Sequence, residues 1–213
     1  MTTALDQILS QSRTFSAFLD HRDHLCTNLD LALVVQAARN ALIEGRARAV
    51  TIFQDASGNR TEVGPQDDIE ALRQRLEPAA ETAPERQGPG RPRLGVVARE
   101  VSLLPRHWEW LGAQPGGASA ALRRLVDQAR KTTRARDAAR QARDAAFRAM
   151  TILVGDQPGF EEASRALYAE DFESFQELSE PWPEGQREHL QRLADVARSL
   201  GELAALEVAG QGR

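Results

Sequence analysis

The chain of 213 residues is poor in cysteine, with Cys26 alone, and poor in aromatic side chains. One thiol forms no internal disulfide and supplies no Cys-x-x-Cys pair for a structural zinc site. No apolar run approaches the ~18 residues that a membrane-spanning helix needs, and the N-terminal MTTALDQILSQSR has no apolar core of signal-peptide length. We therefore expect a soluble cytoplasmic protein that makes no membrane contact.

The sequence also lacks a recognisable catalytic motif or glycine-rich phosphate loop. Ser102 and Cys26 have no His or Asp partner at a motif spacing, and the adjacent acids Glu161 and Glu162 suit a helix N-terminus better than acid–base work. Residues 20–26 (DHRDHLC) hold two histidines, two further acids and the thiol, which zinc or copper could use. Their spacing fits no standard metal site, so we interpret them as a solvated loop. We expect no enzyme, no cofactor and no bound metal.

The charged residues are segregated along the chain, although the net charge is only −4. Residues 86–148 contain 14 basic and 5 acidic residues, a net charge of +9, whereas the rest contains 13 basic and 26 acidic ones, a net charge of −13. Such asymmetry is typical of a chain with a polyanionic partner. It is equally consistent with a basic face that is solvated or docked on the acidic remainder of the chain.

Strand and helix signals alternate in residues 1–77 and predict an α+β domain. The strands are rich in β-branched and aromatic residues, the helices carry apolar residues three and four apart, and Gly45 marks a helix end. The expected elements are a helix at 3–11, a strand at Thr14–Leu19, a helix at Asp30–Glu44, a strand at Ala49–Gln54, a turn at Asp55–Asn59, a strand at Arg60–Val63 and a helix at Gln66–Leu76. Together they predict a small β-α-β-β-α domain after a short first helix.

Residues 78–90, rich in proline, alanine and glycine, predict a linker. Residues 132–206 predict a mostly helical region. Its helices are expected at Thr132–Val154, Phe160–Tyr168, Asp171–Leu178 and Glu184–Leu206, with Trp182 between two prolines as a core anchor. The chain is thus expected to have four parts, at 1–77, 78–90, 91–131 and 132–206.

The third part, residues 91–131, predicts a strand followed by two helices. Arg99–Leu104 (REVSLL) alternates partly between apolar and polar residues. Pro105 suits the first position of a helix, Gly116-Gly117 predicts a turn, and Ser119 is a plausible cap of the next helix. That helix carries an apolar stripe and a separate basic face, formed by Leu122, Leu125, Val126 and Ala129 and by Arg123, Arg124 and Arg130.

This order of strand, helix, glycine turn and helix is similar to the ribbon-helix-helix repressor fold, in which two chains pair their strands into a ribbon that enters the major groove of DNA. By that resemblance Glu100 and Ser102 face the groove and Arg99 flanks the ribbon near the phosphates. The N–H groups of Gly117 and Ser119 would bind phosphate. A plain helix-turn-helix pair and a purely structural helical hairpin are the alternatives.

Gly-Arg-Pro-Arg at residues 90–93 resembles the core of an AT-hook, whose extended arginines lie in the minor groove of A·T-rich DNA. The candidate nucleic-acid contacts are therefore Arg91, Arg93, Arg99, Ser102, Arg106, Gly117, Ser119, Arg123 and Arg124.

A wider resemblance covers most of the chain. The segments GRPRLGVVAREVSLLPRHWEWLGAQPGGASAALRRLVDQAR, TIFQDASGN and GFEEASRAL resemble a bacterial family catalogued as domain of unknown function 2239. The resemblance implies a bacterial cytoplasmic protein and carries no catalytic residue over to this chain.

From the charge and these resemblances we expect a bacterial DNA-binding protein, a homodimer that regulates transcription. Its fold would be α+β, with a ribbon-helix-helix-like segment between the N-terminal domain and the helical region. The alternative is a non-enzymatic interaction protein that uses the basic helix 123–148 to bind an acidic surface, of this chain or of a partner protein.

Overall fold

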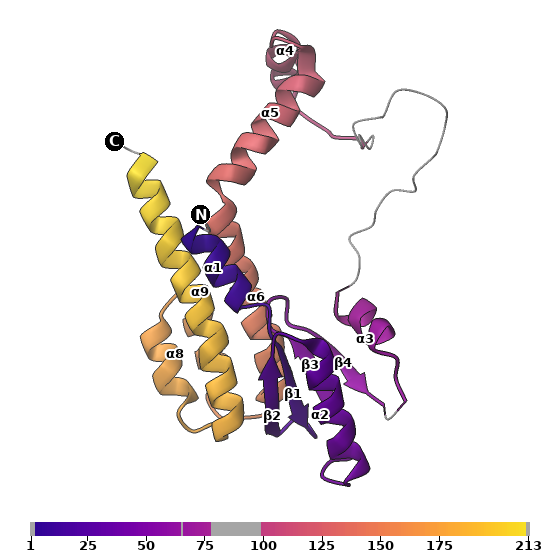
Figure 1. Ribbon diagram of the computed structural model, residues 1–213. Helices are drawn as coiled ribbons and strands as arrows, with labels where there is room; N and C mark the ends of the chain where they lie inside the picture. The colour runs from indigo at the N-terminus through magenta and orange to yellow at the C-terminus, as the bar shows by residue number, and fades with distance from the viewer. Residues whose placement is uncertain (1–2, 65, 78–98, 212–213) are drawn as a thin grey trace, which may run out of the picture. The chain divides into compact units, whose positions relative to one another are not determined.

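The computed structural model describes residues 3–64, 66–77 and 99–211, and its fold is α+β (Figure 1). The chain divides into two compact units, the first made of Met1–Pro78 with Thr133–Arg213 and the second of Ala79–Thr132. The C-terminal helical region, expected to be a part of its own, therefore belongs to the same unit as the N-terminal sheet.

The first unit is built on a four-stranded antiparallel sheet with the strand order β2-β1-β3-β4. Its strands are β1 (Phe15–Leu19), β2 (Asp23–Asn28), β3 (Val50–Gln54) and β4 (Asn59–Val63). Because side chains alternate along a strand, β1 sends Phe15 and Ala17 to one face and Ser16 and Phe18 to the other. The first face packs on α2 (Leu31–Ile43) and α3 (Ile69–Leu76), and the second face packs on the C-terminal helices.

The strand β2 corrects the interpretation of residues 20–26 as a solvated loop. Asp20 and His21 adopt φ values of 48° and 59°, which turn the chain back on itself, and Asp23–Asn28 then pairs with β1. The Asp20 carboxylate stabilises the turn by accepting bonds from the backbone N–H groups of Arg48 and Ala49. The N-terminal order is therefore β-β-α-β-β-α. The sequence did not predict β2, because this polar edge strand lacks the alternation of apolar residues that is typical of a strand.

The other layer of the first unit is helical. It contains α1 (Ala4–Gln11), α6 (Arg134–Leu153), α7 (Phe160–Tyr168), α8 (Phe172–Ser179) and α9 (Glu184–Gln211). The long helices α6 and α9 lie side by side (Figure 1), and buried alanines of α6 such as Ala139 and Ala142 let the two backbones approach closely. Trp182 is buried against Phe175 and its indole N–H donates to the carbonyl of Pro158, which confirms its expected role as a core anchor.

The described part of the second unit consists of α4 (Pro105–Gly112) and α5 (Gly117–Thr132). Pro105 begins α4 as expected, and Gly116 and Gly117 make the turn with φ values of 83° and 74°. The expected strand at Arg99–Leu104 is not formed, because a strand needs a hydrogen-bonded neighbour and no described residue pairs with this segment.

Two further boundaries differ from expectation in this region. The helix α5 begins at Gly117, so Ser119 lies in its first turn and is not its cap. The basic stretch 123–148 is not one helix, since α5 ends at Thr132 and α6 begins at Arg134 in the other unit. Among the described residues, no helix combines the length and apolar character needed to cross a bilayer.

Candidate functional site

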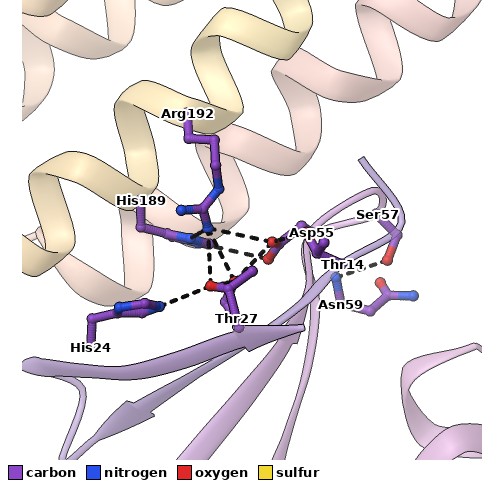
Figure 2. A network of polar contacts seen from close by, with 9 residues as sticks. Thr14, His24, Thr27, Asp55, Ser57, Asn59, His189 and Arg192 are labelled. Atoms are coloured by element: carbon purple, nitrogen blue, oxygen red, sulfur yellow. Dashed lines mark hydrogen bonds and ion pairs between the residues drawn. The ribbon is translucent and has the colours of Figure 1, made fainter. Parts of the chain in front are cut away.

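A buried carboxylate, Asp55, lies directly after β3 in the turn to β4, and its side chain is only 2% exposed. Its Oδ2 atom accepts hydrogen bonds from the hydroxyls of Thr14 at 2.6 Å and Ser16 at 2.8 Å. Both hydroxyls come from the start of β1, next to β3 in the sheet. The sheet therefore holds this carboxylate in one fixed orientation, as Figure 2 shows.

Helix α9 brings two further groups to Asp55 from the opposite layer. His189 Nε2 lies 3.9 Å from Asp55 Oδ1, and Arg192 Nη2 lies 3.6 Å from Asp55 Oδ2. The two residues are three apart, so they share one face of the helix. Arg192 Nη2 is also 2.8 Å from His189 Nδ1. Because a guanidinium only donates, Nδ1 accepts and the ring proton of neutral His189 is on Nε2, facing Asp55.

The edge strand β2 completes the group. Thr27 lies opposite Ser16 in the β1–β2 ladder, and their hydroxyl oxygens are 2.8 Å apart. His24 Nε2 lies 2.9 Å from the same Thr27 oxygen. Arg192 Nη2 approaches both hydroxyl oxygens, at 3.2 Å and 3.3 Å. We call these seven residues the Asp55 network: Thr14, Ser16, His24, Thr27, Asp55, His189 and Arg192.

Burial dominates the protonation of the network. It raises the pKa of Asp55 from 3.8 to about 6, against the opposing hydrogen bonds of Thr14 and Ser16 and the nearby charge of Arg192. Burial also lowers the pKa of His189 well below its usual value, and that of His24 to a lesser degree, with Arg192 adding to both shifts. At neutral pH the network therefore holds a largely ionised carboxylate, one guanidinium and two neutral imidazoles.

Two atoms of this network are buried without a hydrogen-bond partner, namely Asp55 Oδ1 and His189 Nε2. They face each other at a separation too long for a hydrogen bond. Buried polar groups normally find partners, so this pair is held short of its best contact by the packing around it. Of these two groups Asp55, with its raised pKa, is the one that takes up a proton near neutral pH.

A cavity of about 260 Å³ lies beside Asp55, between α1, α6, α9 and the β3–β4 turn. Its walls are mostly apolar, with polar groups from Ser12, Arg13 and Gln141. The cavity gives Asp55 a low-polarity neighbourhood on the side away from the sheet, which fits the raised pKa.

The cysteine and histidines of residues 20–26 do not converge. The parts of the chain that the structure describes contain no cluster of three or more His, Cys, Asp or Glu residues suited to a metal ion. His24 joins the Asp55 network, whereas the carbonyl of His21 accepts a bond from Gln186 of α9. Cys26 is half-buried, and burial raises the pKa of its thiol.

The residues predicted to contact nucleic acid lie in the second unit, apart from the Asp55 network. Arg91 and Arg93 lie outside the described residues. Gly117 is half-buried at the start of α5, and the remaining candidates, Arg99, Ser102, Arg106, Ser119, Arg123 and Arg124, are exposed.

The cations of the two units differ in their partners. In α6, Arg134 pairs with Asp6, Arg143 pairs with Glu170, and Arg148 donates to the carbonyl of Ser57. The described part of the second unit holds six basic side chains and three acidic ones. Within that part no basic side chain forms an ion pair. The six basic residues are Arg99, Arg106, Arg123, Arg124, Arg130 and Lys131.

Large apolar side chains are exposed beside these cations. Trp108 and Trp110 of α4 are 43% and 52% exposed, and Leu125 and Val126 of α5 are also exposed. Only Leu111 and Ala121 are buried in the described part of this unit. Of the expected apolar stripe of α5, Leu122 is half-buried and Leu125, Val126 and Ala129 are exposed when only the described residues are considered.

Sequence reasoning did not find the Asp55 network, except for the metal alternative that included His24. Its members come from a turn, two strands and a helix that is more than 130 residues further along the chain. No spacing rule links such positions. The available signal was the polar Ser16 between apolar residues of β1, and a His and an Arg beside the apolar stripe of the last helix.

Comparison with known proteins gives a match to a family model over residues 14–194, a range that includes every residue of the Asp55 network. Neither the curated proteins nor the solved structures contain a match.

Proposed function

Since the chain belongs to the bacterial family described as "Uncharacterized protein conserved in bacteria (DUF2239)", which names no activity, we propose from its own residues that it binds DNA through α4 and α5. In this proposal the protein is a dimeric transcriptional regulator, and Arg99, Arg106, Arg123 and Arg124 contact the phosphate backbone. Ser102 and the N-terminus of α5 at Gly117 and Ser119 would add neutral contacts.

The proposal rests on a difference between the two units in what their basic side chains contact. Arg134, Arg143 and Arg148 of α6 meet acids or carbonyls of their own unit. The basic side chains of the second unit are exposed and form no ion pair among the described residues, although Arg123 Nε donates to the carbonyl of Ser119 in its own helix. Free cations gathered on one small unit attract phosphates through the release of condensed counterions, without a need for base contacts.

Fluorescence anisotropy with a labelled duplex of about 30 base pairs tests the proposal. The wild-type protein is expected to bind at low salt, and the double variant Arg123→Ala/Arg124→Ala to bind roughly tenfold more weakly or worse, because two phosphate contacts are lost. Arg140→Ala is the matched control: Arg140 is exposed but pairs with Asp137 on α6.

The control variant is expected to bind like wild type. Equal weakening by both sets of substitutions would point to a general charge effect instead of a site on α5. Failure of the wild-type protein to bind any duplex at low salt would overturn the proposal.

A protein partner is the second candidate, favoured by one specific observation. The second unit exposes Trp108, Trp110, Leu125 and Val126 together, and aromatic side chains are enriched in protein interfaces. This candidate predicts that Trp108→Ala/Trp110→Ala abolishes capture of a partner while the affinity for the DNA duplex is unchanged. Loss of DNA affinity in that variant would instead assign the indoles to the nucleic-acid surface.

A further inference from the structure

The hydrogen bonds of the Asp55 network have a direction that the ionised carboxylate fixes. A carboxylate only accepts, so Ser16 donates its hydroxyl proton to Asp55 Oδ2. The Ser16 oxygen is then the acceptor for Thr27, whose hydroxyl proton lies on the 2.8 Å line between them. With that proton committed, Thr27 accepts from His24, which must carry its ring proton on Nε2. The chain of bonds runs from His24 through Thr27 and Ser16 to Asp55.

We propose that His24, Thr27 and Ser16 form a proton relay that connects solvent to the buried carboxyl of Asp55. His24 is the half-buried outer end of the relay, on the edge strand β2, and Asp55 is its buried inner end. Each step is a hydrogen bond of 2.8–2.9 Å between groups that can both donate and accept.

The transfer balances without any other reactant than water. A proton from solvent binds His24 Nδ1, and the proton on Nε2 passes to Thr27. The Thr27 proton passes to Ser16, and the Ser16 proton passes to Asp55 Oδ2. The result is a neutral carboxyl group that donates to Ser16, with every hydroxyl bond reversed and His24 carrying its proton on Nδ1.

The backbone of Cys26 lies at the outer end of the relay, and its hydrogen-bonding effect acts to raise the pKa of His24. At the inner end, Asp55 Oδ1 faces the Nε2–H group of His189 whether or not Oδ2 is protonated. The relay reverses when Asp55 returns its proton to Ser16, Ser16 to Thr27 and Thr27 to His24 Nε2, while the Nδ1 proton leaves to solvent.

Charged and titratable groups around the relay come from each element packed on it. On α9 these are His189 and Arg192 beside Asp55, and Glu188, whose charge acts on His24. Arg13, which follows α1 in the chain, lines the cavity next to Asp55. The polar residue that α6 places in the same cavity is Gln141, which carries no charge. Of these groups Arg192 loses its counterion when Asp55 is protonated, and its side chain is 43% exposed, so water solvates its charge.

The tautomer of His24, measured by two-dimensional ¹H–¹⁵N NMR of the full chain, tests the relay. At pH 7.5 the wild-type ring is expected as the Nε2–H tautomer. As the pH falls through about 6, where Asp55 takes up its proton, the Nδ1–H tautomer is expected to rise in step with the ¹³C shift of the Asp55 carboxyl carbon. His107 of the second unit serves as an exposed reference in the same spectra.

The variant Asp55→Asn sharpens the test. Thr14 and Ser16 donate to the Oδ2 position, so the amide oxygen of the variant is expected there, and it accepts at every pH. His24 is then expected to stay the Nε2–H tautomer as the pH falls through about 6. Thr27→Val breaks the chain, so in that variant the His24 tautomer should no longer follow the Asp55 titration.

Two results would overturn the relay: the Nδ1–H tautomer of His24 in the wild-type protein at pH 7.5, or a wild-type His24 tautomer that stays constant while the Asp55 carboxyl titrates. The wild-type titration gives this answer by itself if either variant does not fold. A purely structural role of Thr27 would change stability but would not separate the His24 tautomer from the Asp55 titration.

Discussion

At the scale of the residue, Asp55 shows how burial creates a group that titrates near neutral pH. A pKa raised from 3.8 to about 6 corresponds to about 3 kcal/mol by which the folded protein disfavours the charged carboxylate. Two hydroxyl donors and a guanidinium near the carboxylate do not offset this cost. A chain that needed only stability would gain by a neutral residue here, so Asp55 fits a functional position better than a structural one.

The pH dependence of stability follows from the direction of this shift. The folded protein binds a proton at Asp55 near pH 6 and the unfolded chain only near pH 4, so Asp55 raises the free energy of unfolding as the pH falls through that window. His189 acts in the opposite direction, since the unfolded chain protonates it below about pH 6.5 and the folded protein does not.

The variant Asp55→Asn separates the two contributions. Its stability relative to the wild-type protein is expected to be highest at pH 7.5 and to decline by up to about 3 kcal/mol by pH 4, because only the wild-type protein gains from protonating residue 55. The contribution of His189 is common to both proteins and cancels. Urea unfolding at pH 7.5, 6.0 and 4.5 measures the difference, and a difference that does not depend on pH would contradict the raised pKa.

At the scale of the element, the hairpin turn after β3 is pressed against α6. A Cβ atom at Gly58 would lie 2.6 Å from the carbonyl oxygen of Ala145 and 2.9 Å from its Cα atom. Gly58 also has a φ of +68°. Glycine is thus required at this position for two reasons, the positive φ and the close approach of α6. Gly58 therefore sets the distance between the turn that holds Asp55 and the helical layer.

The variant Gly58→Ala is expected to lower the free energy of unfolding by roughly 3 kcal/mol, from backbone strain and steric overlap together. Gly45→Ala is the matched control, because Gly45 has a φ of +69° but nothing within 4 Å of its Cβ position. It is expected to cost only about 1 kcal/mol. Equal losses in thermal or urea unfolding would show that the approach of α6 does not constrain the turn.

The elements also show where sequence patterns suffice. The helices and the strands β1, β3 and β4 follow periodicity and turn residues, so their prediction is confirmed to within a few residues. The strand β2 was missed because Asp23 and His24 give no apolar alternation, and its stability comes from pairing with β1. The strand expected at Arg99–Leu104 is not formed for the converse reason, since its sequence alternates but none of the described residues pairs with it.

The Asp55 network lies beyond such patterns, because it depends on which face of β1 meets which face of α9. Ser16, Asp55 and His189 are each unremarkable in their local sequence. Only the packing of the sheet on α9 brings them within a few ångströms of one another. Long-range packing is not encoded by spacing, and this is why the metal alternative for residues 20–26 included His24 but missed its partners.

At the scale of the whole molecule, the two units carry different chemistry. The first unit buries its acid–base groups and neutralises most arginines of α6 internally. The second unit exposes both cations and large apolar side chains. We therefore expect the second unit, and not the basic residues of α6, to be the surface that binds a partner.

A second copy of the chain is the partner that we expect on the exposed apolar side chains of α5. Sedimentation velocity is expected to give twice the 23.5 kDa of one chain, and Val126→Glu to shift the protein toward the mass of one chain, because a buried charge disfavours the interface. Val208→Glu, at an exposed valine of α9, is the control and should leave the mass unchanged. A wild-type protein that sediments as one chain would contradict the dimer.

The salt dependence of DNA binding tests the central proposal most directly. A plot of log K against log salt for the wild-type protein is expected to fall linearly, and Arg123→Ala/Arg124→Ala to make the slope shallower by about 1.8, since each lost phosphate contact contributes about 0.9. Arg140→Ala should keep the wild-type slope. A slope that is identical in the wild-type protein and the double variant, or no binding at low salt, would contradict the account.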